Sequence, residues 1–307
     1  MHRHTTCDTI TQEWCTYLRY TRGFSQHTVR AYVHDISDYL DFAIGEGAFD
    51  ASAVTARSLR AWLGKHVRDG ASRTSVARYT ASIRLWCQWL RRTGRISGDP
   101  AATLHTARAD STLPQTLTRE AIDALLADLA TRAAGGDAMA IRDRAIAELL
   151  YSCGLRISEL ATLNVTDIDH STRSITVHGK GGKDRVVPYG TPAQRALDEW
   201  LSIRADIAAQ PGERALFLGV KGRRIDVRVV RDRIERACVA AHVPVVSPHA
   251  IRHTAATHMV EGGADLRAVQ DFLGHSSLAT TQRYTHVDAT RLSRIVRQAH
   301  PRAARTD

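Results

Sequence analysis

Apolar residues recur every three or four positions along the first hundred residues, which is the spacing that places them on one face of an α-helix. Polar residues and glycines separate these stretches, and we predict helices over residues 9–20, 25–44, 55–67 and 72–92. The last helix has the clearest apolar stripe, formed by Val76, Tyr79, Ile83, Trp86, Cys87 and Leu90. No strand pattern interrupts the helices, so we expect an all-helical N-terminal domain with this stripe in its core.

The pattern becomes mixed after residue 115. Two short runs rich in β-branched residues, 174–178 and 183–188, flank a glycine-rich turn, which predicts a β-hairpin. Helices are predicted from Thr118 and over 141–151, 192–208, 226–241, 249–261, 265–273 and 289–299. The sequence therefore predicts a mostly α fold with a small β-sheet, organised as a helical domain over 1–103, a linker over 104–115, and a mixed α/β domain over 116–307.

Length and composition narrow the class of protein. The 307 residues suffice for two domains that each bury an apolar core. No apolar run approaches the roughly 20 residues that span a bilayer, and the first residues lack the apolar stretch of a secretory signal. The five cysteines include no Cys-x-x-Cys pair. These features favour a cytoplasmic protein with free thiols and no membrane contact.

The charge favours a polyanionic partner, because 42 Lys and Arg against 32 Asp and Glu leave a net charge of +10. Between residues 57 and 95 there are ten basic residues and one acid, Asp69. A solvated helical face usually mixes both signs, so we interpret this stretch as a nucleic-acid contact. The candidate DNA-binding residues are Arg73, Arg78, Arg84 and Arg91.

Three segments of the second domain, 154–160, 248–253 and 273–286, concentrate residue types that bind or attack a phosphate. Arg156 lies at the opening of a short helix, where an ion pair with Glu159 would explain it equally well. His249 and Arg252 are three apart and share a helix face. The third segment has His275 and, nine residues later, Tyr284.

A metal or nucleotide site is disfavoured. His249 and His253 have the four-residue spacing of zinc ligands on a helix, but Arg252 lies between them and no glutamate base accompanies them. The glycine-rich turn at 179–183 lacks the spacing of a phosphate-binding loop and joins two strands. A metal-dependent nuclease would need a ligand cluster that the sequence does not contain, so we expect no metal and no cofactor.

Lysine usage gives an independent indication, because only four of the 42 basic residues are lysines and two of them, Lys180 and Lys183, share the hairpin turn. Arginine does not release a proton in a protein, whereas a lysine near a phosphate can donate one. Either lysine is therefore a candidate general acid, although a flexible charged turn would explain the pair as well.

Together these residues resemble the tyrosine recombinase (phage integrase) family, whose signature is an arginine in a Gly-Leu-Arg context, a hairpin lysine, a His-x-x-Arg pair, a later histidine and a tyrosine. The matching residues here are Arg156, Lys180, His249, Arg252, His275 and Tyr284. The resemblance covers nearly the whole chain. It implies a SAM-like core-binding domain, followed by a catalytic domain that cuts and rejoins double-stranded DNA.

The resemblance also implies a role for each residue. Tyr284 would attack the scissile phosphate and form a 3′-phosphotyrosyl intermediate, as in type IB topoisomerase chemistry. Arg156, Arg252 and His275 would stabilise the charge on the phosphate oxygens. Lys180 would protonate the departing 5′-oxygen, and His249 would assist proton movement at the tyrosine.

Residues 262–267, 273–282 and 299–303 are most similar to the Xer branch of this family, and to its XerC type in particular. That similarity implies recombination at dif-like sites during chromosome partition and cell division. It also implies a heterotetramer with a XerD-type paralogue, and a DNA translocase of the FtsK type as a further partner. A XerD-type enzyme, a mobile-element integrase of the same family and a DNA-binding protein without chemistry are the alternatives.

The predicted last helix has an apolar stripe of Leu292, Ile295, Val296 and Ala299. We expect this stripe to be buried against a neighbouring protomer in the assembly, where it would couple assembly to the position of Tyr284. Packing against its own domain has the same spacing, so both arrangements remain open.

Overall fold

The computed structural model describes residues 6–45, 48–104, 116–179, 184–274, 295–296 and 298–302, and it divides the chain into two compact units, Met1–Thr112 and Leu113–Asp307. We call them the first and the second unit. Residues 105–115 lie outside the described ranges, so the predicted linker and its bounds stay a prediction. No helix within these ranges is both long and apolar enough to cross a membrane.

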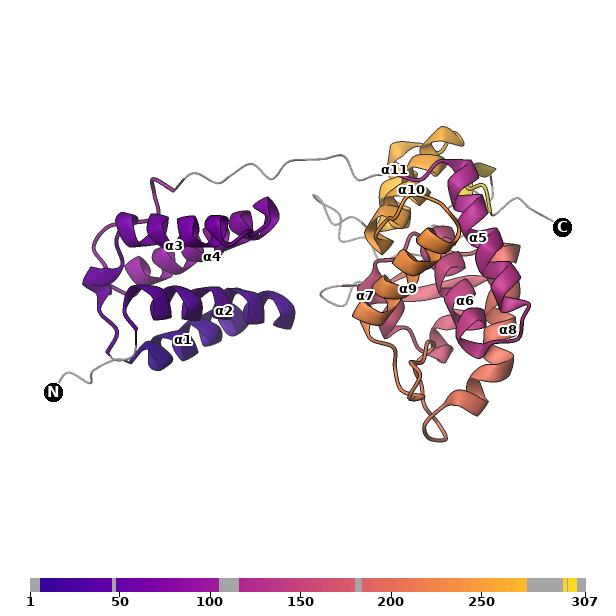
Figure 1. Cartoon of the computed structure of the whole chain (residues 1–307), viewed down its shortest axis with the longest axis horizontal. Helices are drawn as coiled ribbons and strands as arrows, with labels where there is room; N and C mark the ends of the chain where they lie inside the picture. Colours follow the sequence, from indigo (N-terminus) through magenta and orange to yellow (C-terminus); the bar gives the residue numbers. More distant parts are fainter. Residues whose placement is uncertain are drawn as a thin grey trace. The chain divides into compact units, whose positions relative to one another are not determined.

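The regular elements in the described part of the first unit are helices (Figure 1), and one isolated β-bridge joins Thr6 to Ala48. Its helices are α1 (Cys7–Thr16), which continues into a π-helical turn (Tyr17–Thr21), α2 (Gln26–Ala43), a 3₁₀ turn (Ala51–Ala53), α3 (Ala56–Arg68) and α4 (Arg73–Arg92). The side chains of Ser25, Thr55 and Ser72 cap the last three α-helices by accepting a backbone N–H of the first turn. The starts of these three helices therefore agree with the sequence prediction.

The core of the first unit combines aliphatic residues with large aromatic ones, of which Trp14, Trp62 and Trp86 are fully buried. The predicted α4 stripe is buried at each position except Tyr79, which is half-buried. Tyr79 packs at the edge of this core, with its ring 5.4 Å from that of Trp62. The apolar face predicted from the helical spacing is thus the core face of α4.

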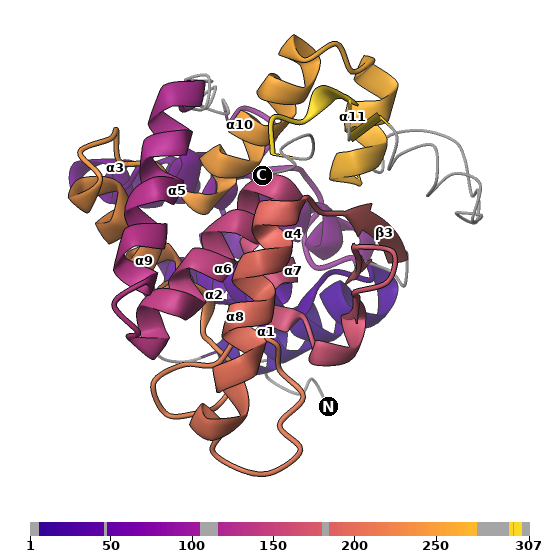
Figure 2. The same ribbon diagram turned by 90° about the vertical axis from the view of Figure 1, so that its right-hand side faces the viewer.

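The second unit is mixed, as predicted, and its small sheet lies at one side of its helices (Figures 1 and 2). Its helices are α5 (Arg119–Ala133), α6 (Ala138–Ser152), α7 (Ile157–Thr162), a 3₁₀ turn (Val165–Asp167), α8 (Thr191–Ile207), α9 (Val227–Ala240), α10 (Pro248–Glu261) and α11 (Leu266–Leu273). Helix α6 is central, because it contacts α5, α7, α8, α9 and α10. Eleven of its fifteen residues are accordingly buried, among them Leu149 and Leu150.

The sheet has three antiparallel strands in the order β1 (Ile168–Asp169), β2 (Ser174–His178) and β3 (Asp184–Pro188). The predicted hairpin is β2 and β3, in which Val177 faces Arg185 across the ladder. Strand β1 was not predicted, because two residues are too short to show an alternating pattern.

Most of the predicted last helix lies outside the described residues, but Val296 and Ala299 are described and are buried in the second unit. Ala299 packs so closely that a Cβ on Gly262 would come within 2.1 Å of its carbonyl oxygen. The expectation that this stripe needs a neighbouring protomer does not hold for these two residues, because their own unit covers them.

Candidate active site

Arg156 lies in the loop before α7, where its side chain contacts Glu159 and is partly exposed to solvent. Arg156 precedes the first residue of α7, and its backbone N–H donates to Glu159 Oε2 at 2.8 Å. Its guanidinium donates to Glu159 Oε1 at 2.7 Å, while 42% of its side chain stays exposed. The ion pair considered from the sequence therefore exists, and it leaves part of the Arg156 guanidinium open to a ligand.

Helix α10 presents His249 and Arg252 from one face. Ser247 caps the helix and Pro248 occupies its first turn, where a missing backbone N–H costs nothing. Arg252 is almost fully buried, and its guanidinium donates to the carbonyl oxygens of Gly154 at 2.6 Å and Leu273 at 2.5 Å. Burial and the neighbouring Arg156 charge lower the pKa of Arg252 to about 10, so it stays protonated at neutral pH.

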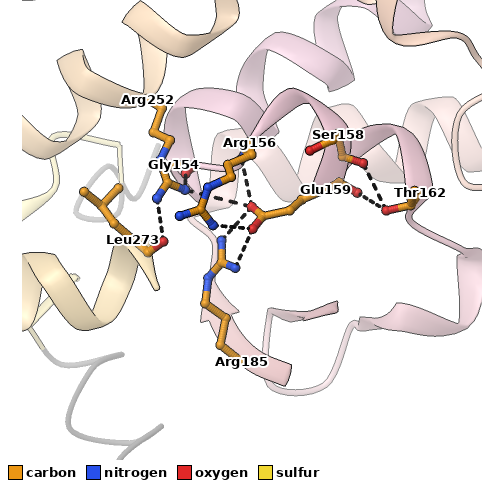
Figure 3. Close-up of polar contacts among 8 residues, drawn as sticks. All are labelled: Gly154, Arg156, Ser158, Glu159, Thr162, Arg185, Arg252 and Leu273. Atoms are coloured by element: carbon orange, nitrogen blue, oxygen red, sulfur yellow. Dashed lines mark hydrogen bonds and ion pairs between the residues drawn. The ribbon is translucent and has the colours of Figure 1, made fainter. Parts of the chain in front are cut away.

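Glu159 joins these two arginines to a third, Arg185 of β3 (Figure 3). Arg185 donates two parallel hydrogen bonds to the Glu159 carboxylate, at 2.9 and 2.8 Å. The nearest guanidinium nitrogen of Arg252 lies 3.9 Å from it. Burial alone would raise the pKa of Glu159, but the hydrogen bonds and charge of Arg185, together with the hydrogen bonds of Arg156, hold it at about 2.

This cluster can bind an anion, because three guanidinium groups surround one carboxylate and leave a net charge of +2. Arginine is suited to phosphate, whose oxygens match the geometry of its donors. The structure thus places two of the predicted site residues, Arg156 and Arg252, in one cluster, whereas from the sequence we considered Glu159 only as an ion-pair partner and did not name Arg185. The sequence did contain an indication of Arg185, because it is a charged residue on the same face of the second hairpin strand as the apolar Val187.

His249 and His253 contact each other, with their Nε2 atoms 2.9 Å apart. One ring must donate and the other accept in such a bond. The part of the chain that the structure describes contains no group of three residues that could hold a metal ion.

Four predicted site residues, Lys180, Lys183, His275 and Tyr284, lie outside the described residues. The described residues that flank Lys180, Lys183 and His275 do reach the cluster. The turn with the two lysines leads into β3 and Arg185, and Gly274, which precedes His275, ends α11 in the left-handed conformation with φ 66°. Both flanking segments therefore end beside the arginine cluster.

The four candidate DNA-binding arginines of α4 have different surroundings. Arg73 and Arg91 are exposed. Arg78 pairs with the buried Asp35 and lies 4.5 Å from the ring centre of Tyr79. Arg84 donates to the carbonyl oxygen of Leu104. Two of the four thus take part in the packing of the first unit, and DNA contact by any of them stays a prediction.

Comparison with known proteins gives a match in both units. Residues 115–291 match the phage integrase family, and residues 11–94 match the phage integrase N-terminal SAM-like domain. The chain is 46% identical to the tyrosine recombinase XerC of Mycobacterium bovis (strain BCG / Pasteur 1173P2), with 96% of this chain and 99% of that protein covered. It is 45% identical to the XerC of Mycobacterium sp. (strain KMS), over 94% and 97% of the two chains.

Solved structures share the fold. The structure of a lambda integrase dimer bound to a core site has a TM-score of 0.67 at 17% identity, with 92% of this chain and 100% of that chain covered. The XerH recombinase bound to a palindromic difH substrate has a TM-score of 0.65 at 20% identity, over 94% and 84%. The helical first unit and the mixed second unit therefore have folds that also occur in these two solved structures.

Proposed function

Because the chain belongs to the phage integrase family and is a XerC-like tyrosine recombinase that cleaves and rejoins DNA at specific sites, we propose that Tyr284 is its nucleophile. The tyrosine oxygen forms a bond to the scissile phosphorus, and the bond from phosphorus to the 5′-oxygen breaks. The products are a 3′-phosphotyrosyl enzyme and a 5′-hydroxyl that can attack a partner strand. One phosphodiester replaces another, so the step can reverse without water or a nucleotide.

The observation that carries the proposal is the convergence of Arg156 and Arg252 in a cluster of net positive charge. Arg156 is half open to solvent, and Arg252 is held rigidly by two backbone carbonyls. Donors fixed in this way stabilise the growing charge of the transition state without reorganising, typically by a factor of about 10² to 10³ each. In the proposal, His275 adds a further donor to the same phosphate.

Proton transfer is assigned to Lys180 and His249. Lys180 donates its proton to the departing 5′-oxygen, because a lysine ammonium can release a proton where an arginine cannot. His249 accepts the phenolic proton of Tyr284, either directly or through a water molecule. The hydrogen bond between His249 and His253 orients the ring for this role.

The biological setting that we propose is that of a XerC-type enzyme in the cytoplasm. It acts at dif-like sites, in a heterotetramer with a XerD-type paralogue, and resolves chromosome dimers before cell division, with a DNA translocase of the FtsK type as a further partner. The identity to XerC proteins over nearly the whole chain supports this assignment. Gel-shift titration on a dif-like site, with and without a XerD-type protein, tests it: the paralogue should raise affinity cooperatively.

A nicked suicide substrate tests the chemistry. The short fragment with the 5′-hydroxyl diffuses away after cleavage, so the strand cannot be rejoined and the covalent adduct accumulates. Wild type should form the adduct, and Tyr284→Phe should bind the same DNA without forming it. The matched control is Tyr189→Phe, which removes a phenolic oxygen from a buried tyrosine of the same unit. Adduct formation by Tyr284→Phe at the wild-type rate would refute the assignment.

The hairpin lysine is tested with a leaving group that needs little protonation. Lys180→Arg should bind DNA but cleave it poorly, because a guanidinium holds its proton too tightly. Replacing the 5′-oxygen by sulfur should restore cleavage by this variant. If Lys183→Arg shows the rescue and Lys180→Arg does not, Lys183 is the general acid.

A further inference from the structure

Arg185 lies where three parts of the proposed site meet. It is the second residue of β3, directly after the turn that contains Lys180 and Lys183. Its guanidinium holds Glu159 with two bonds, and Glu159 in turn holds both the backbone and the side chain of Arg156. A single carboxylate therefore connects the lysine hairpin to the α7 segment.

The same side chain contacts the end of α11. A Cβ on Gly274 would lie 2.9 Å from Arg185 Cδ and 3.1 Å from its Nε. The backbone of Gly274 therefore packs against the Arg185 side chain too closely to leave room for a larger residue. His275 is the next residue in the sequence. The Arg185 side chain is 6% exposed, and its Nε has no hydrogen-bond partner among the described residues. A buried donor without an acceptor costs free energy, which a residue selected for stability alone would avoid.

The charge balance also depends on Arg185. If Glu159 were paired with Arg156 alone, its carboxylate would neutralise the Arg156 guanidinium and weaken the attraction of that guanidinium for a phosphate. Arg185 adds one positive charge, so the net charge of the cluster is +2 instead of +1, and its two bonds to Glu159 leave the exposed part of Arg156 available.

We infer that Arg185 is a positioning residue, which clamps the lysine hairpin onto the Arg156 segment through Glu159 and so sets where the hairpin lysine meets the leaving 5′-oxygen. The inference rests on the proposed function. A misplacement of about 1 Å in such a site can cost about 10²-fold in rate. Loss of the clamp should therefore affect protonation of the leaving group first.

The experiment compares adduct formation on suicide substrates with a 5′-oxygen and with a 5′-sulfur leaving group. Arg185→Met should slow adduct formation on the oxygen substrate by about 10²-fold, while the sulfur substrate should restore it to within about tenfold of wild type. Arg185→Lys keeps a charge but loses the two-pronged contact, so it should show a smaller loss with the same rescue. It also provides a milder variant if Arg185→Met folds poorly. The matched control is Arg132→Met, which removes an exposed arginine of α5 from an ion pair with Asp128 and should leave the sulfur-to-oxygen ratio unchanged.

A double-mutant cycle with Glu159→Gln completes the test, because each of the two changes removes one partner of the same ion pair. The double variant should be no slower than the slower single variant. Equal losses on both substrates, or additive losses in the cycle, would show that Arg185 does not act by positioning the hairpin lysine through Glu159. Wild type without any adduct would instead refute the proposed function, and a Lys180→Arg variant without sulfur rescue would refute the lysine assignment alone.

Discussion

Replacing His300 by glutamine should remove the part of the second unit's loss of stability between pH 7 and pH 5 that protonation of this ring causes. The ring is 1% exposed, and its Nε2 lies 3.2 Å from the carbonyl oxygen of Tyr151, while its Nδ1 accepts the backbone N–H of Arg302 at 3.2 Å. The neutral ring is thus fully bonded. Burial first, and then the nearby His258, Arg302 and Arg119, lower its pKa to about 4 against 6.5, although the bond to Tyr151 opposes the shift.

Whether stability rises or falls with pH depends on which state, folded or unfolded, binds the proton more readily. Above pH 6.5 both states contain a neutral ring and the full stability is present. Below it, the unfolded chain takes up a proton that the folded chain resists, so stability is lost as the pH falls toward 4. A shift from 6.5 to about 4 corresponds to a loss of about 2 kcal/mol between pH 7 and pH 5.

Other groups nearby also titrate. Burial lowers the pKa of His258, which adds to the loss, and burial raises the pKa of Glu148, which opposes it. The difference between wild type and His300→Gln isolates the one ring. Urea unfolding should be followed by the indole N–H signal of Trp200, since the other four tryptophans lie in the core of the first unit.

At pH 8 the difference between the two proteins measures the cost of the substitution itself and serves as the control. At pH 5 the free energy of unfolding of the variant, relative to that of wild type, should be about 2 kcal/mol higher than it is at pH 8. A gap that stays the same from pH 8 to pH 5 would refute the assignment of a buried, neutral His300.

Three further outcomes are expected. Gly154→Ala should destabilise the second unit by about 1–3 kcal/mol, because the residue has φ 55° and its Cβ would lie 2.6 Å from Phe272 Cε1; thermal melting checks this. Arg78→Met should destabilise the first unit by about 3 kcal/mol by leaving the buried Asp35 carboxylate unpaired, whereas Arg91→Met, at an exposed position, should melt like wild type but bind DNA more weakly. EDTA-treated wild type should still form the covalent adduct, since arginine, lysine and histidine supply the proposed chemistry; activity restored only by added magnesium or zinc would contradict it.

Local sequence patterns predicted the elements of this protein well. The starts of α2, α3 and α4 follow from Ser25, Thr55 and Ser72, because a cap bonds to a backbone N–H only a few residues away. The hairpin of β2 and β3 follows from two β-branched runs around a glycine-rich turn. The motif residues likewise led to Arg156 and Arg252, which the structure places in one cluster.

The partners of buried charges could not be predicted in this way. Arg185 and Glu159 are distant in the sequence, and nothing near either residue indicates that β3 and α7 pack together. The same holds for His300, whose neutral state depends on burial against the α6 segment at Tyr151. Capping and helical spacing are set by neighbours within about four residues, whereas the charge state and the role of a buried polar group are set by whichever segments surround it after folding.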